Sequence, residues 1–127
     1  MSDNCEFKIE REHGIDPEKY FWKEEDNNPR QDLWKEQQKQ FGFDDRQLWG
    51  LDMTIATFVY PRLIRFKEIV ISYPNGLTMQ KWYDALDKMI EGFRLIILDQ
   101  TVYTQEELDI QTEAIQLFSK YYFDLWD

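Results

Sequence analysis

The chain has 127 residues, a mass of 15.6 kDa and a net charge of −10. Its length suits one domain with a buried core, and an apolar content of 43% excludes a largely disordered chain. The charge disfavours binding to a bare nucleic-acid duplex, because surfaces that bind duplexes are basic. The single cysteine, Cys5, excludes an internal disulfide, and the single histidine, His13, excludes a multi-histidine metal centre. With no apolar run of about 18 residues and no secretory leader, we expect a soluble protein of a reducing cytosol.

The first 15 residues carry the weakest structural signals. Cys5, Phe7 and Ile9 alternate with charged residues, a pattern typical of a short strand, although a frayed tail fits it equally well. We therefore predict an extended or flexible segment at residues 1–15, followed by a single helical domain at residues 16–127.

Two short helices are predicted next, from their start and stop signals. Asp16-Pro17-Glu18 supplies an N-cap, a proline at the first helical position and an acid in the first turn, and a helix through residues 20–22 follows. Asn28-Pro29 repeats the start signal. Gly42 supplies the stop, with apolar residues at helical spacing between the two signals.

A longer helical stretch is predicted over residues 45–72. Asp44 or Asp45 can cap its beginning. Pro61 lacks a backbone donor and clashes with the preceding turn, so either the helix kinks there or a second helix begins there. The residues from 72 to 76, Ser-Tyr-Pro-Asn-Gly, read as a turn.

The clearest pattern is a pair of amphipathic helices in the last third of the chain. Thr78 caps an apolar stripe over residues 79–98, and Thr104 with Glu107 forms a capping box for a helix over residues 105–125. The short connection between them predicts an antiparallel helical hairpin. Together these signals predict an all-α fold.

Catalytic motifs are weak throughout the chain. His13 lies in the least structured segment, and Cys5 has no base near it in the sequence. Asp84, Asp87 and Glu91 lie within two turns, a spacing loosely compatible with the Mg²⁺ sites of all-α nucleotide pyrophosphohydrolases, but the paired Glu-x-x-Glu and Glu-x-x-Asp signature of those enzymes is absent. We therefore expect no enzymatic activity, no metal ion and no cofactor.

A mildly basic centre offers one candidate binding site. Residues 46–95 carry a net charge of +2, and Arg62 and Arg65 are spaced to grip one phosphate or carboxylate. This interpretation predicts a basic-aromatic pocket for a phosphorylated ligand, made of Arg62, Arg65, Lys67, Tyr60 and Trp82. The alternative is that these cations pair with acids of the same chain, namely Asp52, Asp84, Asp87 or Glu91.

Two acidic ends flank this centre. Residues 1–45 and residues 96–127 each carry a net charge of −6. Solvated helix faces explain such charge in many small proteins, but an acidic surface can also meet a basic partner and mimic nucleic acid. Under the second interpretation the partner-binding residues are Glu106, Glu107, Asp109 and Glu113.

About half of the chain, residues 42–93, resembles a group of small proteins that bacteriophages encode. The likeness runs through Gly42-Phe43-Asp44-Asp45, Leu48-Trp49-Gly50-Leu51-Asp52, Tyr60-Pro61-Arg62-Leu63-Ile64-Arg65, Tyr73-Pro74 and Trp82-Tyr83-Asp84-Ala85-Leu86. The resemblance implies a phage origin and a location in the cytoplasm of the infected bacterial host. It assigns no catalytic residues.

Two functions from different classes follow. The first is a non-enzymatic binding protein that engages a host or anti-phage defence factor, through an acidic surface that mimics nucleic acid. The alternative is a nucleotide-binding protein that sequesters a small phosphorylated ligand, or hydrolyses it with Mg²⁺. The 21 aromatic residues also predict a homodimer or a larger assembly, with the last helix and its Tyr121, Tyr122 and Trp126 as the contact.

Overall fold

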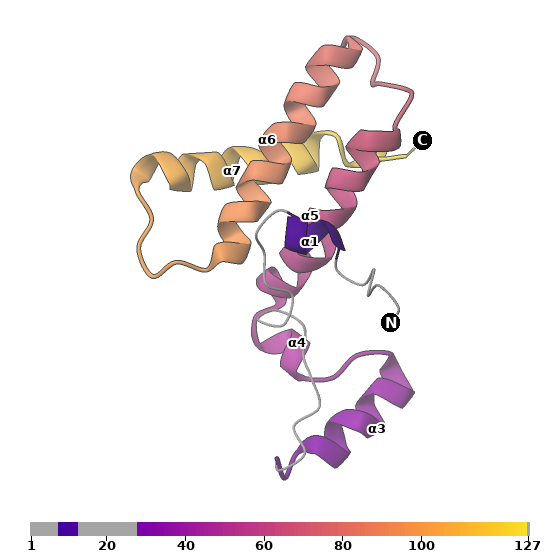
Figure 1. The fold of residues 1–127 in the computed structure, drawn as a ribbon, viewed down its shortest axis with the longest axis vertical. Coiled ribbons are helices and arrows are strands. Elements are labelled where there is room, and N and C mark those ends of the chain that lie inside the picture. Colours follow the sequence, from indigo (N-terminus) through magenta and orange to yellow (C-terminus); the bar gives the residue numbers. More distant parts are fainter. Residues whose placement is uncertain (1–7, 13–27, 127) are drawn as a thin grey trace. The chain divides into compact units, whose positions relative to one another are not determined.

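The computed structural model describes residues 8–12 and 28–126, and these residues form helices joined by loops, with no strand among them (Figure 1). The all-α prediction is confirmed. The segment predicted as a helix through residues 20–22, together with Cys5 and His13, lies outside the described residues. Contacts along the chain separate two compact units, Met1–Ile55 and Ala56–Asp127, which are described in turn.

The first described element is the short helix α1, Lys8–Glu12. The alternating pattern predicts an extended or flexible segment here, and for these five residues the chain is helical instead. An exposed i,i+4 ion pair joins the side chains of Lys8 and Glu12 at 3.8 Å. Such a pair favours the helical spacing over the extended one, although its contribution is small.

Helix α3, Gln31–Phe41, ends at the predicted stop signal, Gly42. Gly42 adopts a left-handed conformation, with φ of +83°, and its N–H donates to the Gln38 carbonyl at 2.9 Å. Only glycine takes this conformation without steric cost, so the helix ends there.

The stretch predicted as one kinked helix divides earlier than Pro61. Helix α4, Arg46–Trp49, ends at Gly50, whose ψ of 68° is not helical. Helix α5, Leu51–Ile69, then runs through Pro61 without ending, so no second helix begins at the proline. Because glycine loses the most freedom on joining a helix, Gly50 is the easier residue at which to interrupt it.

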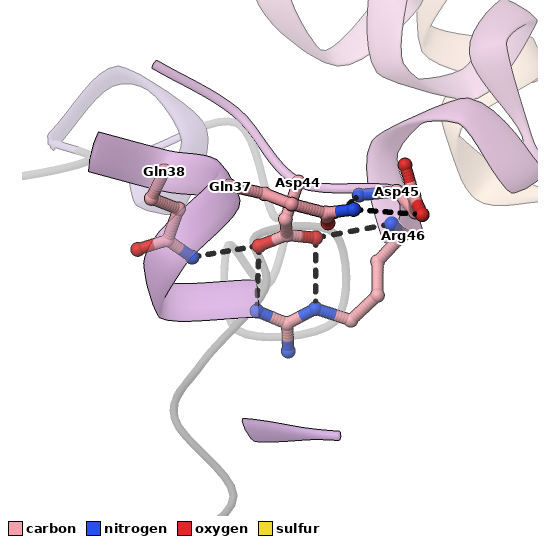
Figure 2. Close-up of polar contacts among 5 residues, drawn as sticks. All are labelled: Gln37, Gln38, Asp44, Asp45 and Arg46. Atoms are coloured by element: carbon pink, nitrogen blue, oxygen red, sulfur yellow. Dashed lines mark hydrogen bonds and ion pairs between the residues drawn. The ribbon is translucent and has the colours of Figure 1, made fainter. Parts of the chain in front are cut away.

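A buried ion pair ties α4 to α3 within the first unit (Figure 2). The Arg46 guanidinium donates from Nε and Nη2 to the two carboxylate oxygens of Asp44, at 3.0 and 2.9 Å. The amide of Gln38 on α3 donates to the same carboxylate at 2.6 Å. Both charged residues are buried, at 2% and 3% exposure, and the guanidinium lies 4.1 Å from the ring centre of Trp34. The pair therefore has the partners that buried charges require.

Beside this pair, Asp45 takes a different role from the one predicted. It stands at the N-cap of α4 but its side chain makes no capping hydrogen bond. Instead the Gln37 amide donates to the Asp45 carboxylate at 2.9 Å, and the Asp45 N–H donates to Gln37 Oε1 at 3.0 Å. The backbone N–H of Arg46, the first residue of α4, donates to the Asp44 carboxylate at 3.0 Å. Both aspartate side chains thus accept hydrogen bonds from α3 where it meets α4.

In the second unit, helices α6, Met79–Leu98, and α7, Gln105–Lys120, form the predicted helical hairpin (Figure 1). The Lys81 N–H donates to the Thr78 hydroxyl at 3.1 Å, and the Thr104–Glu107 capping box is complete. Both predicted caps are confirmed. Helix α7 ends at Lys120, short of the predicted 125, and a 3₁₀ turn, η1, Tyr122–Asp124, follows.

The core of the second unit gathers around Trp82. This side chain is fully buried and meets Phe66 of α5 edge to face at 6.4 Å and Tyr121, just beyond α7, at 5.4 Å. Trp82 therefore joins three parts of the unit in one cluster. Other buried apolar residues of this core are Tyr60, Leu63, Ile64, Leu86, Met89, Phe93, Ile97 and Ala114.

Candidate functional site

The two aromatic residues of the predicted basic-aromatic pocket are in the core. Tyr60 is 1% exposed and Trp82 is 0% exposed. A ring that stacks on a ligand base must present a face to the site. Neither residue does so, because both faces are occupied by the protein interior.

The three cations of that pocket are each engaged separately. Arg65 pairs with Glu68 one turn along α5 at 2.9 Å, and Lys67 pairs with Asp87 of α6 at 2.6 Å. Arg62 donates from Nη1 to the Phe58 carbonyl at 2.9 Å. The expected internal pairing is therefore seen for Lys67 with Asp87, while Arg65 takes an acid that the sequence analysis did not name.

The four acids predicted to bind a partner also have different local roles. Glu107 closes the capping box by accepting from the Thr104 N–H at 2.9 Å. Glu113 pairs with Lys88 of α6 at 3.0 Å. Asp109 accepts from the Gln105 amide at 2.9 Å, and Glu106 is exposed in the first turn. Among the described residues, only Glu113 of these four acids is thus paired with a cation.

The carboxylates on α6 follow the same pattern. Asp84 accepts from Gln80 at 3.0 Å, and Glu91 forms a two-pronged pair with Arg94. The Arg94 hydrogen bonds lower the pKa of Glu91 against the opposing effect of burial. Within residues 8–12 and 28–126, no group of three histidine, cysteine or acidic side chains is placed to hold a metal ion.

An apolar groove lies between α5 and the end of the chain in the second unit. Its volume is about 260 Å³. Arg62 is the single charged residue among those that line it, and its guanidinium lies over the Phe58 ring at 3.7 Å from the ring centre. The groove is lined by Phe58, Val59, Arg62, Leu63, Phe66, Phe118 and Leu125.

A row of aromatic rings leads from the core to the rim of this groove. Phe93 contacts Phe118 at 5.4 Å, Phe118 contacts Tyr122 at 5.8 Å, and Tyr122 contacts Phe123 at 5.4 Å, all edge to face. Exposure rises along the row, from 2% at Phe93 to 56% at Tyr122 and 86% at Phe123. We call the exposed aromatic residues beyond α7, Tyr122, Phe123 and Trp126, the aromatic surface.

The sequence predicts the aromatic surface only in part and does not predict the groove. Of the predicted contact residues Tyr121, Tyr122 and Trp126, Tyr121 packs on Trp82, whereas Trp126 is 69% exposed. The i,i+4 spacing of Phe58 and Arg62 was a local signal for the stacked arginine. The groove also needs Phe118 and Leu125, which lie far away in the sequence.

Comparison of the chain with models of known families, with curated proteins and with solved structures finds no match. The resemblance to phage-encoded proteins therefore stays a prediction. In the part of the chain that the structure describes, no helix has both the length and the apolar character needed to cross a membrane.

Proposed function

We propose that this chain is a non-enzymatic binding protein that docks a protein partner on its aromatic surface and the adjoining groove. The observation that carries the proposal is the exposure of Phe123 and Trp126 beside a groove with a stacked arginine. Tyrosine, tryptophan and arginine are the residues that most often dominate the binding energy of protein interfaces. An exposed apolar patch is a liability in a chain that binds nothing.

The structure gives less support to the nucleotide-binding alternative. Tyr60 and Trp82 are buried, and Arg65 and Lys67 are already paired with acids. In the groove, a phosphorylated ligand would meet one cation, Arg62, because the other lining side chains are apolar. We therefore propose the protein-binding function in its place.

The resemblance to phage-encoded proteins favours a host or anti-phage defence protein as the partner, met in the cytoplasm of an infected bacterium. A net charge of −10 supports a partner of basic character, because opposite charge speeds encounter. In this proposal Glu106 and Asp109 supply attraction at long range, and the aromatic surface supplies the contact.

Photo-crosslinking from the aromatic surface tests the proposal. Benzoylphenylalanine in place of Phe123 is expected to form a discrete adduct when the full chain is irradiated in bacterial cells, because Phe123 is 86% exposed at the docking surface. The matched control is the same probe in place of Gln116, which is exposed on α7 two residues past buried Ala114 and so lies on the opposite side of that helix.

Two outcomes bear on the proposal directly. A position-123 adduct that disappears when Val59 is replaced by tryptophan, which fills the groove, supports docking at this site. Absence of an adduct at position 123, or equal labelling from positions 123 and 116, contradicts it. A circular dichroism spectrum and a melting curve for each variant establish that the fold is retained.

A further inference from the structure

The groove has the dimensions of a site for one bulky side chain. Its volume of about 260 Å³ lies below the ~300 Å³ at which pockets for drug-sized ligands begin. Six of its seven lining residues are apolar, and Arg62 carries the single charge. A fitting occupant is therefore an aromatic or large aliphatic side chain with a carboxylate close to it.

The chain itself contains such a segment. Phe123 and Trp126 are the most exposed aromatic residues beyond α7, at 86% and 69%, and Asp124 lies between them. Asp124 is the single charged residue in the segment 121–126, and no described cation is paired with it. Its charge is opposite to that of Arg62, so the segment and the groove are complementary in both polarity and charge.

The groove and this segment are also neighbours on one molecule. Leu125 lines the groove, while Tyr122 contacts Phe118, another lining residue, at 5.8 Å. A surface on which a protruding side chain lies beside a matching groove is self-complementary. A two-fold axis between the two features places the protruding side chain of each copy over the groove of the other copy. None of the residues that the structure describes covers the aromatic surface, as its exposure shows.

We propose that in the free protein this groove receives a second copy of the chain, whose segment 122–126 inserts an aromatic side chain while its Asp124 pairs with Arg62. This inference rests on the docking surface of the proposed function, and a basic host partner would displace the second copy from it. Net charges of −10 on both copies do not prevent the contact, because exposed charges separated by more than ~8 Å are screened at physiological salt.

Charge reversal with rescue tests the assignment. Sedimentation equilibrium over a dilution series of the full chain is expected to show a particle of about twice 15.6 kDa. Arg62→Glu alone and Asp124→Arg alone should each weaken dimerisation by about tenfold or more, because each places like charges opposite one another. The double variant restores an opposite pair and should return the dimer to within about threefold of the unmodified chain.

Arg65→Glu is the matched control. Arg65 is an exposed arginine on the same helix, pairs with Glu68 and does not line the groove, so its reversal should leave dimerisation unchanged. If a reversal variant loses its fold, Val59→Trp gives a second route, since it blocks the groove without changing any charge. It should make the chain monomeric with an unchanged circular dichroism spectrum.

The outcomes separate this inference from the proposed function. A single 15.6 kDa species throughout the series, with a heterologous adduct from position 123 in cells, overturns the second-copy assignment and leaves the docking surface standing. A dimer that neither the single reversals nor Val59→Trp weaken places the self-contact elsewhere and also overturns the assignment. A monomer with no adduct at position 123 overturns both.

Discussion

Replacing Gly92 with alanine is expected to destabilise the α6–α7 hairpin by about 1–3 kcal/mol, although alanine favours a helix over glycine by roughly 0.5–1 kcal/mol. The reason is the close approach of the two helices. A Cβ at position 92 would lie 2.1 Å from Ala114 Cβ and 3.0 Å from the Ile110 carbonyl oxygen. Both Gly92 and Ala114 are buried, so the added methyl group fits only if the two helices move apart. Urea unfolding measures the change.

A second substitution makes this prediction specific. Gly92→Ala combined with Ala114→Gly removes the shortest clash and should recover part of the lost free energy of unfolding. The control is Gly50→Ala, where an added Cβ meets nothing closer than 3.7 Å. A Gly92→Ala variant at least as stable as the unmodified chain would show that the helices do not pack this closely.

Replacing Asp44 with alanine is expected to reduce the stability of the α3–α4 region by about 3–5 kcal/mol, because it breaks a buried ion pair that two hydrogen bonds from the Arg46 guanidinium hold together. Hydrogen exchange of the backbone amides in residues 31–49 measures this locally. Asp45→Ala is the control, since the Asp45 carboxylate is exposed and, among the described residues, accepts a hydrogen bond from Gln37 alone. Equal loss of protection in the two variants would contradict a special role for the buried pair.

The same carboxylate should make the first unit sensitive to acid. Hydrogen bonds from the Arg46 guanidinium hold the pKa of Asp44 below its ordinary value of 3.8, against the effect of burial. A lowered folded pKa contributes stability that is present above the unfolded value and is lost as the pH falls through the folded one. Protection of residues 31–49 should therefore fall when the pH drops below about 3.8. A similar fall in Asp44→Ala would show that other groups cause it.

Local signals account for the parts of the fold that sequence predicts well. The caps at Thr78 and Thr104 and the stop at Gly42 each depend on residues within four positions of one another, and all three appear as expected. The division at Gly50 was not predicted. Pro61 was the stronger local signal, yet α5 continues through it. A helix held by tertiary packing can lose one hydrogen bond and survive.

The candidate site depended on contacts that a sequence pattern does not contain. Tyr60 and Trp82 are residue types that can stack on a base. Whether their rings are buried or exposed is decided by how α5, α6 and Tyr121 pack. The groove likewise forms only when Phe118 and Leu125 meet α5. An amphipathic pattern predicts which face of a helix is apolar, and it leaves open which apolar residues stay exposed after packing.

Mapping the crosslink from position 123 in the purified chain tests the central claim most directly. Equal amounts of isotopically light and heavy protein, both carrying the photoreactive residue in place of Phe123, are mixed and irradiated. If the aromatic surface docks in the groove of a second copy, mass spectrometry should find light–heavy peptide pairs that join position 123 to residues 58–66. Crosslinks confined to single chains, or light–heavy pairs that join position 123 to other segments, would contradict the account.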